Sequence, residues 1–177
     1  MNSLVVATGW KPAGKSSGGL LSSIIGGRSG GKEIDVDTSI IMLDANGRFH
    51  NIVYYGQKDA PGIKHHGDNL VGSSKGDAEQ ISIDLNKVPP EVDKLVVMTN
   101  IYSGANDFSA VQGAYVRVLN QSGNEIARYN LTESGKESPT VIIGEIYKHN
   151  GEWKFGAKEE YLPVKSLSEV VNMYKRT

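Results

Sequence analysis

The chain has 177 residues, with 19 basic and 20 acidic side chains and a formal net charge of −1, so it lacks the strongly basic surface of a dedicated nucleic-acid binder. It contains no cysteine, which excludes disulfides, thiolate zinc sites and cysteine nucleophiles. The length fits a single domain, residues 1–177, that can bury a core without covalent cross-links.

The N-terminal segment predicts a strand. Residues 3–10 combine β-branched and apolar side chains and end at a Lys-Pro pair. The segment has no basic region before its short apolar run, which is too short for a signal peptide, and no stretch of the chain approaches membrane-spanning length. The sequence therefore predicts a cytoplasmic protein that is not inserted in a membrane.

Residues 13–32 differ in composition from the rest of the chain. They are rich in Gly and Ser and carry only four large apolar side chains, at Leu20, Leu21, Ile24 and Ile25. Such a composition is typical of a flexible loop rather than of a packed element.

The chain from residue 34 onward reads as a series of strands. Residues 34–44 and 48–55 predict a hairpin, because Asn46 and Gly47 tolerate the positive φ of a tight turn. An acidic loop at 56–78 follows. Alternating or continuous apolar residues then predict six more strands, at 79–85, 95–102, 114–119, 125–131, 140–148 and 152–158.

The C-terminal tail alone has helical spacing. Leu167, Val170, Val171 and Tyr174 fall on one stripe of residues 166–176, and Ser166 suits an N-cap. Many short strands and one terminal helix predict a mainly β protein, an antiparallel β-sandwich with a short C-terminal helix.

One motif points to nucleotides. Residues 9–16, GWKPAGKS, match the phosphate-binding pattern, with Gly14, Lys15 and Ser16 as its binding residues. The helix that this motif requires is disfavoured by four glycines within the next eleven residues. Nucleotide binding is therefore kept as an alternative and is not the preferred interpretation.

The acidic residues predict a calcium site. Asp35 and Asp37 lie two apart on a predicted strand, so both leave the same face. The last, glycine-rich part of the acidic loop, with the first residue of the next strand (67–79), adds four more oxygen-bearing side chains, those of Asp68, Asn69, Asp77 and Glu79. Calcium takes six to eight oxygen ligands and accepts backbone carbonyls among them. These six side chains are the predicted metal ligands.

Catalytic patterns are weak by comparison. There is no G-x-S-x-G elbow, and the adjacent His65 and His66 point to opposite faces of an extended chain. Glu145 lies in an apolar run and fits a paired structural acid better than a catalyst. The sequence predicts no catalytic residues and no enzymatic activity.

Several segments in order carry a family resemblance. They are GW at 9–10, DVDTS at 35–39, HHGDNLVG at 65–72, GDAE at 76–79, YVRVLN at 115–120, ARYNL at 127–131 and GEIYKHNGEWKF at 144–155. The chain thereby resembles the tellurium-resistance TerD family of bacterial stress proteins over nearly its whole length. The resemblance implies a calcium-binding sandwich of two facing sheets, without established enzymatic activity.

Carried over by position, the family's calcium pattern falls on the same six residues. The family commonly has a denser acidic run in the second half of the loop, where this chain has Ser73, Lys75 and Ala78, which argues against a second ion. The resemblance implies other tellurium-resistance proteins as partners, with a membrane complex as one location. The preferred hypothesis is a calcium-binding stress-response scaffold or sensor, and a metal-free interaction module is a further alternative.

Overall fold

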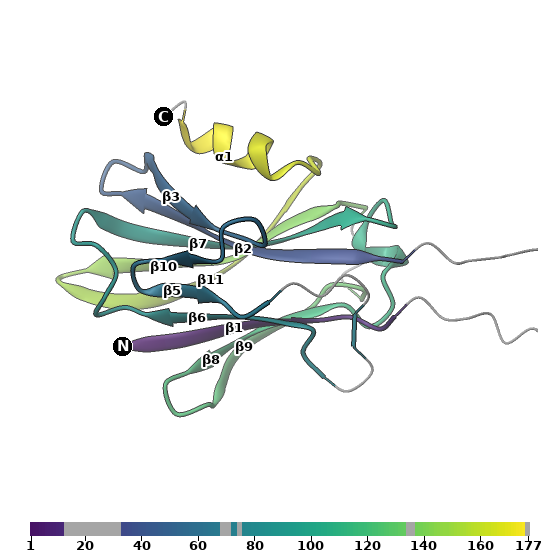
Figure 1. Ribbon diagram of the computed structural model, residues 1–177, viewed down its shortest axis with the longest axis horizontal. Coiled ribbons are helices and arrows are strands. Elements are labelled where there is room, and N and C mark those ends of the chain that lie inside the picture. Colours follow the sequence, from purple (N-terminus) through teal and green to yellow (C-terminus); the bar gives the residue numbers. More distant parts are fainter. Residues whose placement is uncertain (13–32, 68–71, 74–75, 134–136, 176–177) are drawn as a thin grey trace, which may run out of the picture.

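The computed structural model describes residues 1–12, 33–67, 72–73, 76–133 and 137–175. Within them, two antiparallel sheets face each other, and helix α1 (Leu167–Lys175) lies on the outer side of the five-stranded sheet (Figure 1). The predicted antiparallel sandwich with a C-terminal helix is confirmed. No helix of the described chain is long and apolar enough to cross a bilayer.

The six-stranded sheet is built around the first strand. In spatial order its strands are β4 (Asp59–Ala60), β5 (Ile63–His65), β6 (Glu79–Asp84), β1 (Ser3–Gly9), β8 (Tyr115–Asn120) and β9 (Glu125–Asn130). β1 pairs with β6 so that Thr8 lies opposite Glu79, and with β8 so that Gly9 lies opposite Tyr115. The acidic loop therefore leads into the centre of this sheet.

The five-stranded sheet carries the first aspartates. Its order is β11 (Glu152–Leu162), β10 (Thr140–His149), β7 (Val92–Ser103), β2 (Asp35–Asp44) and β3 (Phe49–Val53). β2 pairs with β7 along its whole length, whereas its pairing with β3 begins only at Ile40. The first half of β2 consequently has no ladder partner on its β3 side among the described strands.

The side chains of β2 point alternately into two separate apolar cores, one on each face of the five-stranded sheet. Val36, Ile40 and Met42 point between the sheets, into the larger cluster of buried residues. Ile41 and Leu43 point the other way and pack with Val170 and Val171 of α1 in a second cluster. Since side chains alternate along a strand, the odd-numbered residues at the start of β2 also face the α1 side.

Local signals in the sequence explain two boundaries. The Asp44 carboxylate accepts hydrogen bonds from the amides of Asn46 and Arg48 at 2.8 and 2.9 Å, which closes the predicted hairpin turn. At the start of α1, the Ser166 amide donates to Glu169 at 3.3 Å, as expected for the predicted cap.

The structure adds two short strands that the sequence pattern missed. β4 and β5 lie inside the region predicted as an acidic loop, and β5 pairs with β6 through Ile63, Lys64 and His65. With two and three residues, they are too short to show an alternating pattern. The predicted flexible loop at 13–32 lies outside the described residues.

Candidate functional site

Four of the six predicted metal ligands belong to the described chain, while Asp68 and Asn69 lie outside it. Asp35 and Asp37 share the outer face of β2, as predicted, and are 7% and 3% exposed. Placing two like charges side by side, largely out of water, is unfavourable unless other groups or a cation compensate. The pair is thus a chemically suitable place for a cation.

Glu79 points in a different direction, between the two sheets. Its side chain is fully buried, and Oε2 accepts a hydrogen bond from the Thr38 amide at 3.2 Å. This amide lies in the part of β2 that β3 does not reach. Nε2 of the buried His65 lies 3.7 Å from the same oxygen, and Nδ1 accepts from the Gly67 amide. Glu79 therefore joins the two sheets across the core.

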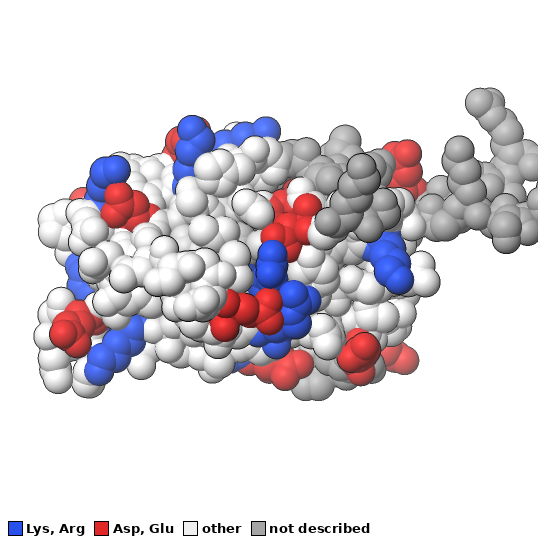
Figure 2. All heavy atoms as spheres, turned by 90° about the horizontal axis from the view of Figure 1, so that it is seen from below, with Lys and Arg blue, Asp and Glu red and all other residues white. Residues whose placement is uncertain are grey.

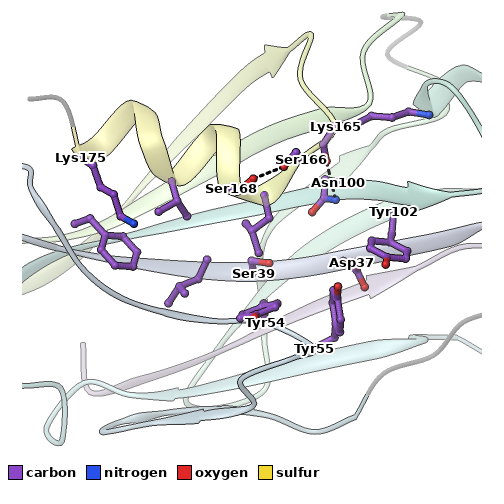
Figure 3. Close-up of a pocket in the computed structure, with 14 residues that line it drawn as sticks. Asp37, Ser39, Tyr54, Tyr55, Asn100, Tyr102, Lys165, Ser166, Ser168 and Lys175 are labelled. Atoms are coloured by element: carbon purple, nitrogen blue, oxygen red, sulfur yellow. Dashed lines mark hydrogen bonds between the residues drawn. The ribbon is translucent and has the colours of Figure 1, made fainter.

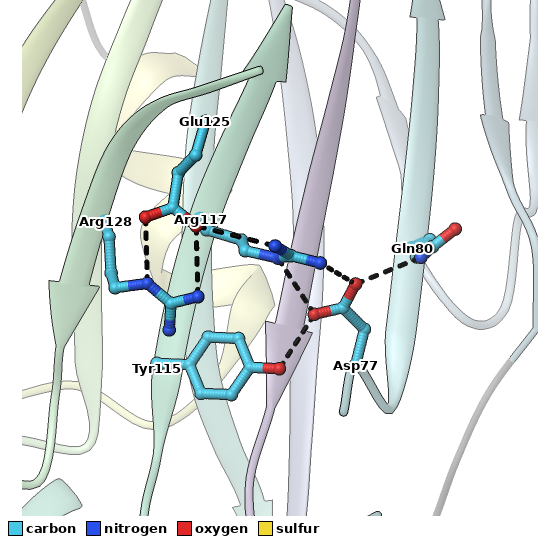
Figure 4. A network of polar contacts seen from close by, with 6 residues as sticks. All are labelled: Asp77, Gln80, Tyr115, Arg117, Glu125 and Arg128. Atoms are coloured by element: carbon cyan, nitrogen blue, oxygen red, sulfur yellow. Dashed lines mark hydrogen bonds and ion pairs between the residues drawn. The ribbon is translucent and has the colours of Figure 1, made fainter. Parts of the chain in front are cut away.

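Asp77 lies on the outer face of the six-stranded sheet (Figure 4). Arg117 donates to both of its carboxylate oxygens, at 3.1 and 2.8 Å. The Tyr115 hydroxyl donates to it at 2.8 Å and Gln80 at 3.1 Å. A calcium ion at Asp77 would have to compete with Arg117 for these oxygens.

The contacts of Asp77 set the charge of this surface. Burial raises the pKa of Asp77, but hydrogen bonds from Arg117, Tyr115 and Gln80 together hold it below its usual value. Burial and the hydrogen bond to Asp77 raise the pKa of Tyr115 to about 12. Seen from the side of this sheet, acidic and basic side chains lie next to one another near the middle of the face (Figure 2). Asp77 is therefore ionised and paired at neutral pH.

We expect Asp77→Asn to lower the free energy of unfolding at neutral pH by about 2 kcal/mol, because Arg117 then loses a charged, partly buried partner. Because the pKa of Asp77 is lowered in the folded state, this contribution is present above its ordinary value of 3.8 and is lost as the pH falls further. Urea unfolding of both proteins between pH 7 and pH 2.5 measures the difference.

Asp84→Asn is the matched control for this experiment. Asp84 pairs with Lys87 on an exposed surface, where solvent screening leaves an ion pair only a small net contribution to stability. A loss for Asp77→Asn no larger than that of Asp84→Asn would contradict the structural role of the Arg117 pair.

The described residues do not bring the acidic side chains to one point. Among them, no group of three or more Asp, Glu or His side chains is arranged to hold a metal. The described part of the loop is nevertheless tied to the start of β2, because the Ser73 amide donates to the Trp10 carbonyl and the Trp10 indole donates to the Ile34 carbonyl, each at 2.9 Å. The described residue Ser73 of the loop is thus linked through Trp10 to the residue that precedes β2.

Polar partners of these residues escaped the sequence analysis. Tyr115 and Arg117 alternate on one face of β8, a period-two signal that could have predicted a pairing surface. Ser39 follows Asp35 and Asp37 at the same spacing, and Asn100 interrupts an apolar strand. Both are buried on the α1 side, at 1% and 3% exposure.

The other sequence predictions have mixed outcomes. Gly14, Lys15 and Ser16, the residues of the nucleotide alternative, lie outside the described chain. Glu145 is paired with Lys94 at 3.1 Å and Lys158 at 3.6 Å, which confirms its prediction as a paired acid.

Comparisons with known proteins agree with this architecture. The family model of the TerD domain matches residues 1–174. Stress response protein SCP2 of Bacillus subtilis is 40% identical over 98% of this chain and 90% of its own length. Tellurium resistance protein TerD of Serratia marcescens is 38% identical over 72% of this chain and 71% of its own length. A crystal structure of a TerD homologue from Streptomyces coelicolor shares the fold, with a TM-score of 0.80 at 16% identity and 98% coverage of both chains.

Proposed function

Because this chain belongs to the TerD domain family, we propose that it is a calcium-binding stress-response protein that acts without catalysis, as a cytoplasmic scaffold or sensor. Asp35 and Asp37 provide the first carboxylates of the site. Further oxygens come from the acidic loop, for which the sequence predicts Asp68 and Asn69. Other proteins of the tellurium-resistance type are the proposed partners.

The buried pair of aspartates is the observation that carries the proposal. Asp35 and Asp37 leave the same face of β2 and are almost completely withdrawn from water. A hard divalent cation prefers such carboxylate oxygens and offsets their mutual repulsion. The proposed ligands offer only oxygen donors, which favours calcium over softer metals.

The position of the loop supports the same site. Its Ser73 amide is bonded to Trp10, and the Ala78 amide donates to the Thr8 carbonyl at 2.8 Å. These bonds hold the described part of the loop at the end of the sandwich where β2 begins. Asp77 and Glu79, which the sequence also predicts as ligands, have structural partners in the described chain, so the proposal leaves them out of the calcium ligands.

We expect excess calcium to raise the thermal midpoint relative to excess chelator. A ligand present at a hundredfold excess over its Kd stabilises the folded state by about 2.7 kcal/mol, which corresponds to about 5 to 10 °C for a domain of this size. The double variant Asp35→Asn, Asp37→Asn should lose the shift, and so should Asp68→Asn. Differential scanning calorimetry with magnesium as a control ion measures it.

Asp77→Asn is the matched acidic control. This variant should unfold at a lower temperature than the wild type at every calcium concentration. It should keep the calcium-dependent shift, because in the wild type the Asp77 oxygens already accept hydrogen bonds from Arg117. The proposed site is wrong if calcium leaves the wild-type midpoint unchanged, or if the Asp35, Asp37 double variant responds like the wild type.

A further inference from the structure

A cavity of about 580 Å³ lies between α1 and the outer face of the five-stranded sheet (Figure 3). β2 and β7 form its floor, α1 and the segment before it form one wall, and residues of β3 and the turn after it form the other. This volume is in the range of small-molecule sites, which combine apolar walls with a few placed polar groups.

Two buried atoms on the cavity floor have no hydrogen-bond partner among the residues that the structure describes. They are Ser39 Oγ and Asn100 Oδ1. The orientation of the Asn100 amide is fixed by its nitrogen, which donates to the Lys165 carbonyl at 3.4 Å, and Figure 3 shows the oxygen turned away from that contact. A buried acceptor without a partner is unfavourable, so the floor is suited to a ligand that donates hydrogen bonds.

The end of the cavity that contains Asn100 carries negative charge. Asp37 lies directly opposite Asn100 in the β2–β7 pairing, and directly opposite residues share one face of a sheet. A hydrogen bond with Tyr102, burial and the charge of Asp37 raise the pKa of Tyr55 to about 12, so this tyrosine stays neutral. A cationic group is therefore favoured over a neutral or acidic one.

Tyrosine rings line the same end. Tyr55 packs edge to face against Tyr54 and Tyr102, with ring centres 5.1 and 5.4 Å apart. Aromatic rings around a cation add attraction beyond hydrogen bonding.

The opposite end is apolar. Of the two described lysines that line the cavity, Lys175 lies at this end, whereas Lys165 lies near Asn100. Phe49, Ile52 and Val171 line the apolar end, and the Lys175 amine lies 5.0 Å from the Phe49 ring centre. The Lys165 amine is bonded to the Ala105 carbonyl, at 2.9 Å. In Figure 3, Lys175 lies at the far end of the cavity from Asp37 and Tyr102. The cavity thus offers acceptors at one end and an apolar surface toward the other.

We propose that this cavity binds a small organic amine, with its primary ammonium group at Ser39, Asp37 and Asn100 and its apolar body along Phe49, Ile52 and Val171. The three N–H donors of a primary ammonium match the three oxygen-bearing side chains. The amine site shares Asp37 with the proposed calcium site, whereas Ser39 and Asn100 are outside the proposed metal ligands, so the two sites are tested separately in calcium-free protein.

The test is an NMR titration of the calcium-free protein with 2-phenylethylammonium at millimolar concentrations. We expect saturable shifts of the Ser39 and Asn100 resonances. The controls 2-phenylethanol and 3-phenylpropionate have a similar body without the cationic group and should bind at least tenfold more weakly. Equal binding of the alcohol, preferred binding of the acid, or no shifts at these residues would overturn the proposal.

Two variants locate the interaction. Ser39→Ala removes a buried hydroxyl that has no hydrogen-bond partner in the described part of the chain, so it should fold normally and weaken amine binding about tenfold. Tyr102 is 59% exposed, so Tyr102→Leu should also fold and weaken binding about fivefold. Ser122→Ala, in the exposed turn between β8 and β9, should leave the affinity unchanged. If Ser39→Ala binds the amine as tightly as the wild type, the assignment of the ammonium group is wrong.

Discussion

Trp10→Ala should cause the largest loss of stability among single substitutions near the proposed site, about 3 to 5 kcal/mol in the free energy of unfolding. Trp10 is among the largest fully buried side chains, at 1% exposure. Its indole donates to the Ile34 carbonyl, and its own carbonyl accepts from Ser73. Removing it leaves a cavity, and the Ile34 carbonyl loses its donor. Urea unfolding followed by circular dichroism measures the loss.

Two substitutions separate packing from hydrogen bonding. Trp10→Phe keeps an aromatic ring but removes the donor to Ile34, so it should lose about 1 to 3 kcal/mol. Trp153 is only partly buried, with the Lys148 amine 5.1 Å from its ring centre, so Trp153→Ala should have a clearly smaller effect than Trp10→Ala. An unchanged urea midpoint for Trp10→Ala would show that this end of the sandwich does not depend on the indole.

Glu79→Ala should lower the free energy of unfolding by about 2 to 4 kcal/mol, with and without calcium. The substitution takes the acceptor from the buried Thr38 amide and the neighbouring carboxylate from His65. Neither group can turn to water without opening the space between the sheets. Thermal and urea unfolding in chelator and in calcium measure this loss directly.

Glu79→Gln retains an acceptor oxygen and should lose less than Glu79→Ala. Glu125→Ala provides an exposed acidic control, because the ion pairs of Glu125 with Arg117 and Arg128 lie at the surface, where solvent screening leaves them only a small net contribution to stability. If Glu79→Ala lost stability only in the presence of calcium, Glu79 would act mainly as a metal ligand, and its predicted role as a link between the sheets would be wrong.

Most of the fold was accessible from local patterns in the sequence. Period-two alternation located β6, a continuous apolar run located β7, and helical spacing with the cap residue Ser166 located α1. These signals depend on neighbours in sequence, since a strand or helix that buries one face must repeat its apolar residues at a fixed period.

The candidate site was accessible only in part. The sequence placed Asp35 and Asp37 on one face of one strand, which the structure confirms, because that relation is set by the strand period alone. It could not show that Asp77 and Glu79, two residues apart, lie on opposite sides of the six-stranded sheet, Asp77 on its outer face and Glu79 in the core. Arg117 holds one of them and the Thr38 amide holds the other. Both partners are distant in sequence and become neighbours through strand pairing.

The sequence by itself determined the strand and helix content, the sandwich class, the family and the existence of an acid-rich segment, because each is encoded in local period or in ordered motifs. Only the tertiary structure decided which strands pair. It also decided that Asp35 and Asp37 stay together, whereas Asp77 is paired with Arg117. The cavity between α1 and β2, which both Ser39 and Asn100 line, likewise exists only in the folded structure. The physical reason is that burial, ion pairs and polar groups without hydrogen-bond partners depend on contacts between segments far apart in the chain. A pattern of neighbouring residues cannot predict such contacts.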